Sequence, residues 1–295
     1  MNKIDSFLDF LKHEKRYSKY TLNAYRIDLS QFQSFCEEAY KISDDSEVSH
    51  HIIRSWLVQL VELNRSAKSI NRKLSSIKSY FKYLLKKRQV QINPAAAVVA
   101  PKIGKKLPVY VEEREMDQLF LSVDFADDFW GTQEKFILEL FYALGIRLSE
   151  LVNLTIDSFD LANSQLKVKG KGNKERLLPM HPQLLEAYDN YCNKRSAHFL
   201  EIQHDILFLR KNGQPIYPRM VQRIVKKNLE KVSTITNKSP HVLRHSFATH
   251  LSRMGADLNA IKDLLGHTSL AATQIYTHNN IEQLKEIHRK THPKA

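Results

Sequence analysis

Two prolines that interrupt a helical pattern constrain the organisation of this chain more than any other feature. Before them, apolar residues recur at three- and four-residue steps, which is typical of amphipathic helices. The segment 93–102 then breaks this pattern with Pro94 and Pro101. The chain has 295 residues, whereas one domain usually has about 100 to 200 residues. We therefore expect a helical domain at 1–92, a linker at 93–107 and a second domain at 108–295.

The first domain is expected to consist of four helices, the second starting near Ser18 or Thr21 and the fourth near Ser66. In the fourth helix, basic residues lie between the apolar positions, so this helix is expected to expose a basic side. Such a side can bind DNA phosphates through displaced counterions, and it can equally be only solvated. The candidate DNA-binding residues are Lys68, Arg72 and Lys73.

The second domain is predicted to be mainly helical with one small sheet. Helical spacing indicates helices around 112–123, 132–144, 149–154, 181–197, 218–231 and 239–254. Residues 164–179 instead alternate apolar and polar positions on either side of a glycine-containing turn, Gly170 to Lys174, which is typical of a β-hairpin. The expected fold class is thus mainly α with a small β-sheet in the second domain.

The charge of the chain concerns its partners rather than its fold. The formal net charge is +13, the pI is near 9.5, and Lys and Arg exceed Asp and Glu in both halves. A polyanion is the expected partner, although solvated basic faces would give the same balance.

Cys36 and Cys192 lie far apart, which predicts neither a disulfide framework nor a zinc site and fits a reducing cytoplasm. No signal peptide or long apolar stretch is found, so we expect a soluble cytoplasmic protein.

Four short motifs in the second domain contain candidate chemical groups. In the first, Arg147 stands where a loop is expected to meet a helix, with Glu150 three residues later. Taken alone, this pair is more typical of an ordinary helical ion pair. The second is Lys171, at the expected tip of the hairpin, where a lysine is usually only solvated.

The third motif opens a helix with a Ser239-Pro240 start. His241 and Arg244 are three residues apart near this start, where the helix dipole and free N–H groups favour an anion such as a phosphate. His245 and His250 have no zinc-ligand companions of the HExxH kind, so we expect them to be packing or surface residues.

The fourth motif surrounds a predicted helix end. Gly266 is expected to end a helix, His267 to lie in the turn after it, and Tyr276 to be presented by a short helix that follows. A single tyrosine in such a place is normally a core residue. Only the combination of the four motifs indicates otherwise.

Together these residues resemble the tyrosine recombinase, or phage integrase, family, and the whole chain is similar to its Xer subgroup. The family pattern is an Arg, a hairpin Lys, His-x-x-Arg, a Leu-Gly-His motif and a Tyr nine residues after that last His. All six positions are filled in order, by Arg147, Lys171, His241, Arg244, His267 and Tyr276.

The resemblance implies a role for each residue. Tyr276 would attack a DNA phosphodiester to give a 3′-phosphotyrosine and a free 5′-hydroxyl, and Lys171 would protonate the leaving oxygen. Arg147 and Arg244 would clamp the charge that develops on the phosphate, and His267 would add a hydrogen bond. His241 would act as general base or as a further donor. Glu150 is better placed to support Arg147 than to bind a metal, and no metal or other cofactor is expected.

The resemblance also implies partners. Members of the family close their two domains around duplex DNA and work as tetramers on two sites, each subunit docking a C-terminal helix onto its neighbour. Here that helix is expected at about 281–290, with packing on its own domain as the alternative. Chromosome dimer resolution is the predicted role, with a paralogous recombinase and a DNA translocase as possible partners. The alternatives are a mobile-element integrase, a type IB topoisomerase-like enzyme and an inactive DNA-binding paralogue.

Overall fold

The structure is a computed structural model that describes residues 3–104, 109–170, 174–199, 201 and 204–266. The chain divides into two compact units, Met1–Lys106 and Leu107–Ala295, and each is described by itself. Among the described residues, none of the helices combines the length and the apolar character needed to cross a bilayer.

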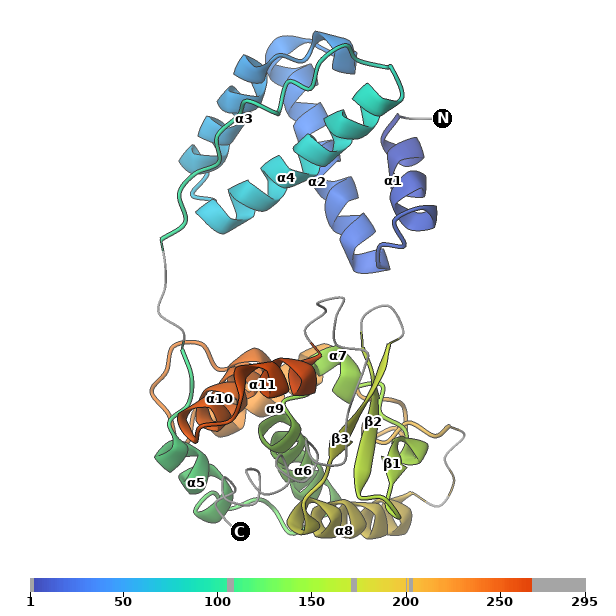
Figure 1. The fold of residues 1–295 in the computed structure, drawn as a ribbon, viewed down its shortest axis with the longest axis vertical. Coiled ribbons are helices and arrows are strands. Elements are labelled where there is room, and N and C mark those ends of the chain that lie inside the picture. Colours follow the sequence, from blue (N-terminus) through green and yellow to red (C-terminus); the bar gives the residue numbers. More distant parts are fainter. Residues whose placement is uncertain (1–2, 105–108, 171–173, 200, 202–203, 267–295) are drawn as a thin grey trace. The chain divides into compact units, whose positions relative to one another are not determined.

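The described part of unit 1 contains four α-helices (Figure 1), as predicted. Serines start three of them: the side chains of Ser18, Ser49 and Ser66 each accept a hydrogen bond from a backbone N–H in the first turn. Such caps satisfy N–H groups that have no partner inside the helix. The helices are α1 (Lys3–His13), α2 (Lys19–Tyr40), α3 (His50–Glu62) and α4 (Ala67–Lys86), with a 3-10 turn η1 (Asp45–Glu47) before α3.

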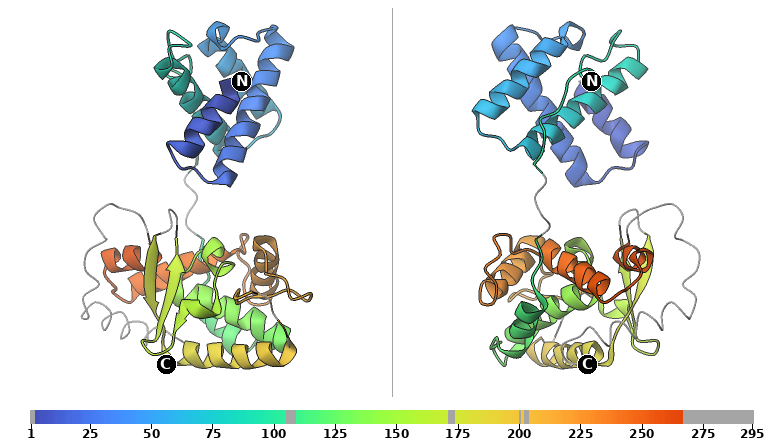
Figure 2. Two further views of the ribbon diagram at one scale, coloured as in Figure 1. Left: turned by 90° about the vertical axis from the view of Figure 1, so that its right-hand side faces the viewer. Right: turned by 60° about the vertical axis from the view of Figure 1, so that its left-hand side comes forward.

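All four helices contribute to one core. Phe7, Leu29, Ile53 and Ile77 come from α1, α2, α3 and α4 in turn, and each is at most 1% exposed. Helix α4 packs against the other three (Figure 2). Burial of these apolar stripes stabilises helices that would be marginal alone.

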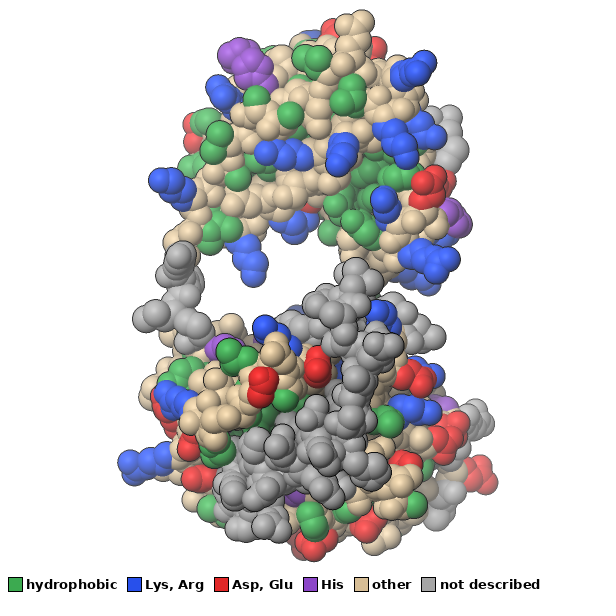
Figure 3. Space-filling view, viewed as in Figure 1, with side chains coloured by type: hydrophobic (Ala, Val, Ile, Leu, Met, Phe, Trp, Pro, Cys, Tyr) green, Lys and Arg blue, Asp and Glu red, His purple; other side chains and the backbone are tan. Residues whose placement is uncertain are grey.

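The basic side expected on α4 is only partly present. Figure 3 shows Lys and Arg side chains spread over the visible surface of unit 1, and Lys68 and Arg72 are exposed. The side chain of Lys73, however, is 8% exposed, and its ammonium lies 3.0 Å from the buried carboxylate of Asp28. The prediction that Lys73 lies on an exposed basic side is therefore wrong, because a buried carboxylate needs a cationic partner.

Unit 2 is mainly helical with a small sheet, so the predicted fold class is confirmed. Its described elements are α5 (Glu113–Leu121), α6 (Phe129–Leu144), α7 (Leu148–Leu151), η2 (Ile156–Ser158), β1 (Phe159–Asp160), β2 (Gln165–Lys169), β3 (Glu175–Pro179), α8 (Pro182–His198), α9 (Pro218–Leu229), α10 (Pro240–Arg253) and α11 (Leu258–Leu265).

The sheet is antiparallel with the order β1-β2-β3, and β2 and β3 form the predicted hairpin. Leu166 lies opposite Leu178, and Val168 lies opposite Arg176. Leu166, Val168 and Leu178 are all buried, so one face of the sheet packs on the core. Arg176 lies on this same face, so one of its core-facing positions is occupied by a cation.

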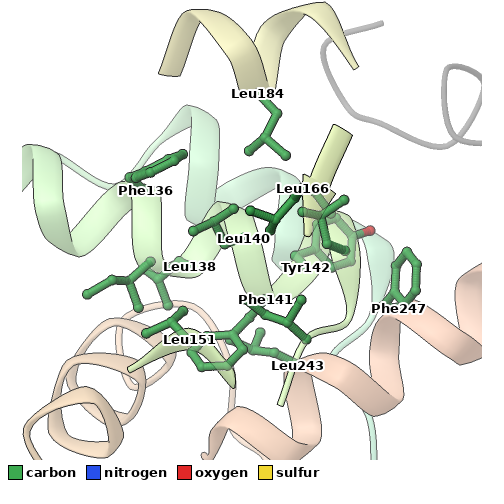
Figure 4. Packing of buried hydrophobic residues seen from close by; sticks show 14 of the residues in the cluster. Phe136, Leu138, Leu140, Phe141, Tyr142, Leu151, Leu166, Leu184, Leu243 and Phe247 are labelled. Carbon is green, nitrogen blue, oxygen red and sulfur yellow. The ribbon is translucent and has the colours of Figure 1, made fainter. Parts of the chain in front are cut away.

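Helix α6 is the centre of unit 2. Eleven of its 16 residues are buried, whereas charged residues such as Glu134, Lys135 and Glu139 are only half-buried. It packs against α8 on one side and α10 on another. Figure 4 shows Leu140 and Phe141 of α6 close to Leu184 of α8 and Leu243 of α10. This packing fixes the position of α10 relative to the residues that follow α6.

Candidate active site

The end of α6 places the first motif. Gly145 ends this helix in the left-handed region, at φ +55°. A Cβ there would lie 2.4 Å from Cδ1 of Phe247 on α10, so the close contact with α10 requires glycine as well. Ile146 is then buried, and Arg147 becomes the residue that precedes α7.

The expected contact between Arg147 and Glu150 is present. The backbone N–H of Arg147 donates to Oε2 of Glu150 at 2.7 Å, and its Nη1 donates to Oε1 at 2.8 Å. The carboxylate side chain is 1% exposed, whereas the Arg147 side chain is 29% exposed. Glu150 therefore holds Arg147 from the protein side and leaves part of its guanidinium accessible.

Arg244 lies in α10, which starts at Pro240 as predicted. The residue is 8% exposed, and its guanidinium donates to the carbonyls of Gly145 and Leu265. Burial lowers the pKa of Arg244 to about 10, and the nearby Arg147 acts in the same direction. This guanidinium is thus still a cation at neutral pH. His241, one turn earlier, is exposed.

Within the described residues, three arginines bind the C-terminal end of α11. Gly266 ends this helix as predicted, at φ +61°. Carbonyls at a helix end lack intrahelical partners and carry partial negative charge, so they attract cations. Three consecutive carbonyls each accept one arginine: Leu264 from Arg176 Nε at 2.9 Å, Leu265 from Arg244 Nη2, and Gly266 from Arg147 Nη2 at 2.7 Å.

Glu150 joins two of these arginines. Arg176 donates to its two carboxylate oxygens in a bidentate pair, with Nη1 at 2.7 Å from Oε1 and Nη2 at 2.8 Å from Oε2. Burial opposes the charge on Glu150, but the hydrogen bonds from Arg176 and Arg147 outweigh it and lower its pKa to about 2. Glu150 is therefore an anion at all physiological pH values, and arginine donors occupy both of its oxygens.

Arg176 is the site residue that the sequence analysis missed. It lies in β3, and its side chain is 9% exposed. A usable signal was present: the hairpin alternation assigns position 176 to the same face as the buried Leu178. A charged residue on the inward face of a strand needs a buried partner of opposite charge.

Three predicted site residues, Lys171, His267 and Tyr276, lie outside the described residues, as does the segment expected to form the docking helix, 281–290. Their positions in the chain are nevertheless bounded by described structure. The N–H of Gly170 donates to the carbonyl of Lys174 at 2.8 Å, and residue 171 falls between these two residues in the sequence. Position 267 directly follows the helix end that the three arginines bind.

The two other histidines of the third motif have ordinary surroundings. His250 is 1% exposed, and its Nδ1 lies 3.0 Å from the hydroxyl of Tyr142. Burial lowers its pKa, so His250 is neutral near pH 7. His245 is half-buried. Among the described residues, no group of three or more His, Cys, Asp or Glu is arranged to hold a metal ion.

Comparison with known proteins identifies the family. Residues 110–283 match the model of the phage integrase family, and residues 4–88 match that of the phage integrase N-terminal SAM-like domain. Tyrosine recombinase XerC of Natranaerobius thermophilus is 40% identical over 299 residues, covering 100% of this chain and 99% of the relative. Tyrosine recombinase XerD of Staphylococcus haemolyticus is 36% identical over 293 residues, with 99% of each chain covered.

Solved structures agree on the fold. The XerH site-specific recombinase bound to its difH substrate matches 96% of this chain and 82% of its own, with a TM-score of 0.70 and 21% identity. This likeness concerns the fold alone. With the family models and the full-length relatives, it leads to one conclusion: the chain belongs to the phage integrase family of tyrosine recombinases, in the Xer subgroup.

Proposed function

We propose that this protein is a site-specific recombinase that cuts and rejoins duplex DNA through a covalent bond between Tyr276 and a 3′-phosphate. One observation carries this proposal: Arg147 and Arg244 both lie at the end of α11, the helix after which His267 and Tyr276 follow. Two fixed cations are thereby held where the segment that contains the proposed nucleophile begins.

The arginines would stabilise the transition state. Attack on a phosphodiester gathers negative charge on the nonbridging oxygens, and guanidinium groups bind such oxygens with fixed geometry. A guanidinium has five N–H groups, and the side chain of Arg147 is 29% exposed. The N–H groups that already bind backbone carbonyls hold each guanidinium in place. Its remaining N–H groups can donate to the phosphate oxygens.

The other members of the hexad would handle protons. A tyrosine hydroxyl has an ordinary pKa near 10, so attack near neutral pH requires cationic neighbours and a proton acceptor. His241 is exposed at the start of α10 and would serve as base or as a phosphate donor, and His267 would add a hydrogen bond. Lys171 at the hairpin tip would protonate the leaving 5′-oxygen. The phosphotyrosyl bond conserves the energy of the broken bond, so rejoining needs no nucleotide.

Residues 1–92 and 108–295 would act as the two halves of a clamp on DNA, with Lys68 and Arg72 as phosphate contacts. Both halves of the sequence are basic, which favours binding along a phosphate backbone. The segment 281–290 would dock onto a neighbouring subunit in a tetramer of identical or paralogous chains. The biological role would be chromosome dimer resolution in the cytoplasm, with a DNA translocase as a further partner.

The decisive experiment is to map covalent protein–DNA adducts in host cells that produce the wild type, Tyr276→Phe or Tyr40→Phe. Tyr40 is an exposed tyrosine at the end of α2, so its variant is the matched control. We expect adducts at one chromosomal site with the wild type and the control, and none with Tyr276→Phe. Adducts that persist in Tyr276→Phe would refute the chemistry. Adducts at the ends of a mobile element would refute dimer resolution and leave the chemistry intact.

A further inference from the structure

Arg176 differs from the two arginines of the hexad in what its donors reach. Nε binds the Leu264 carbonyl, and Nη1 and Nη2 bind the two oxygens of Glu150. Its side chain is 9% exposed, against 29% for Arg147. Arg244 is as buried, at 8%, but it donates to two backbone carbonyls and not to a carboxylate. The fork of Arg176 therefore faces the protein, and its bonds connect parts of the site instead of offering donors to a phosphate.

The elements that Arg176 connects are those that hold the proposed catalytic groups. It belongs to β3, the strand that follows Lys171 in the sequence. Glu150 belongs to α7 and holds Arg147, and Leu264 belongs to α11, after which His267 and Tyr276 follow.

Two glycines show how closely these elements meet at Arg176. A Cβ at Gly170, the residue before Lys171, would lie 3.5 Å from Oε1 of Glu150 and 3.7 Å from Nη1 of Arg176. A Cβ at Gly266 would lie 3.2 Å from Nη1 of Arg176. The backbone at Gly170 and at Gly266, which precede Lys171 and His267 in the sequence, thus packs against the ion pair.

We propose that Arg176 is a positioning residue that ties the Lys171 hairpin to both Arg147 and the end of α11, and so sets the geometry of strand cleavage without touching DNA. This inference rests on the proposed function. It predicts that Lys cannot replace Arg176: an ammonium is a point charge on a flexible stem, whereas this place uses three donors of a planar fork toward two different partners.

The variant that tests this inference is Arg176→Lys, and Arg195→Lys is its matched control. Arg195 lies in α8, is 6% exposed, and donates to the carbonyls of Leu207 and Ile206 at 3.1 and 3.0 Å. It is also a buried arginine that holds backbone carbonyls, but it has no bond to Glu150 or α11. The two variants therefore share the loss of a buried guanidinium and differ in what that guanidinium holds.

The assay uses a DNA duplex that carries the site recovered by adduct mapping. We expect Arg176→Lys to form the covalent adduct at least about 100-fold more slowly than the wild type, and to bind the same duplex with an affinity within about threefold of it. Arg195→Lys should change neither quantity by more than about threefold once the folded fraction is equalised. Equal cleavage by Arg176→Lys and the wild type would overturn the inference, and so would a parallel loss of binding and cleavage.

A pH profile of cleavage, in which each rate is divided by the folded fraction measured at the same pH, covers the case in which Arg176→Lys folds poorly. The charged groups around Glu150 are Arg176 of β3, Arg147 before α7 and Arg244 of α10. Without the bidentate partner the pKa of Glu150 rises from about 2, so between about pH 5 and pH 3 the corrected rate of Arg176→Lys should fall more steeply than that of the wild type. Arg195→Lys should follow the wild type, and identical profiles for Arg176→Lys and the wild type would overturn the inference. A wild type that forms no adduct at all would refute the proposed function itself.

Discussion

Each unit contains a buried carboxylate held by two basic side chains, and the two clusters differ in where their bonds lead. In unit 1, Asp28 of α2 is fully buried and accepts hydrogen bonds from Arg72, Lys73 and Ser76, all on α4. These bonds join two neighbouring helices, and one of the donors, Arg72, is half exposed at the surface. Such a cluster fixes the packing of one helix pair.

In unit 2, the bonds of Glu150 continue through its arginines. Arg147 and Arg176 come from different elements, and each also binds a carbonyl at the end of α11. One of them is partly exposed. A buried carboxylate therefore does not by itself identify an active site. What distinguishes Glu150 is that its two arginines come from different elements and both bind the end of α11, after which His267 and Tyr276 follow.

The largest effect expected from this contrast is on the stability of unit 1. Asp28→Asn keeps the shape of the side chain but leaves the buried Lys73 without a counter-charge, so unfolding free energy should fall by about 4 kcal/mol. Urea unfolding followed by Trp56 fluorescence in a Trp130→Phe background measures this, because Trp56 packs beside Lys73 with its ring 5.8 Å from Nζ. A loss below about 1 kcal/mol would mean that the ion pair contributes little more than a solvated one.

A somewhat smaller effect is expected from the titration of Glu150. Its pKa in the folded protein is about 2, below the ordinary value of 4.5. This difference contributes about 3 kcal/mol to the free energy of unfolding. The contribution is present in full above about pH 5 and is lost as the pH falls toward 2.

Unit 2 unfolding, followed by Trp130 in a Trp56→Phe background, should show this loss in the wild type. The Glu150→Gln variant should lack it, because glutamine does not titrate. The difference between the two proteins in the pH dependence of unfolding free energy reports Glu150 alone, because the other carboxylates are present in both. If the two curves stay parallel from pH 6 to pH 3, the charge on Glu150 is not stabilised as its contacts indicate.

The order of the two carboxylates should reverse when the rate of cleavage is measured instead of stability: Glu150 should matter more than Asp28. Glu150→Gln removes the charge that holds Arg147 and Arg176, so we expect adduct formation to slow by about 100-fold, the typical effect of weakening one transition-state donor. Asp28→Asn, compared at an equal folded fraction and at saturating DNA, should cleave within about threefold of the wild type because Asp28 lies in another unit. Single-turnover cleavage of the mapped duplex provides both rates. Similar slowing in both variants would remove the functional distinction between the clusters.

Sequence patterns predicted the elements of both units better than the bonds between them. The serine caps, the helix ends at Gly145 and Gly266 and the strands of the hairpin all follow from local rules, so they could be read from nearby residues. The partners of Arg176 could not, because Glu150 and Leu264 are distant in sequence and only the folded chain brings them together.

Lys73 illustrates the same limit in unit 1. It lies three residues after Ile70 and four before Ile77, both buried, so helical spacing already assigns it to the inward face of α4. Its charge argued for exposure, and the sequence offered no means of weighing one against the other. Asp28 on α2 decides the outcome. Charged residues on apolar faces are therefore the places where pairing across elements should be sought first.

The smallest expected effect tests whether the end of α11 is a packed junction or only a helix end. Gly255→Ala and Gly266→Ala both place a Cβ on a left-handed backbone, at φ +86° and +61°, which costs about 1 kcal/mol in either case. At Gly255 nothing lies within 4 Å of the added atom, whereas at Gly266 it lies 3.2 Å from Nη1 of Arg176 and 3.4 Å from Nη1 of Arg147.

Gly266→Ala should therefore destabilise unit 2 by up to about 1 kcal/mol more than Gly255→Ala, as overpacking typically does. It should also slow cleavage, because the added methyl pushes on the guanidinium that would bind the phosphate. Paired urea unfolding and single-turnover cleavage of the two variants measure both effects. If Gly266→Ala matched Gly255→Ala in both, the arginines could shift freely around the end of α11. The network around Glu150 would then be no more rigid than the Asp28 cluster.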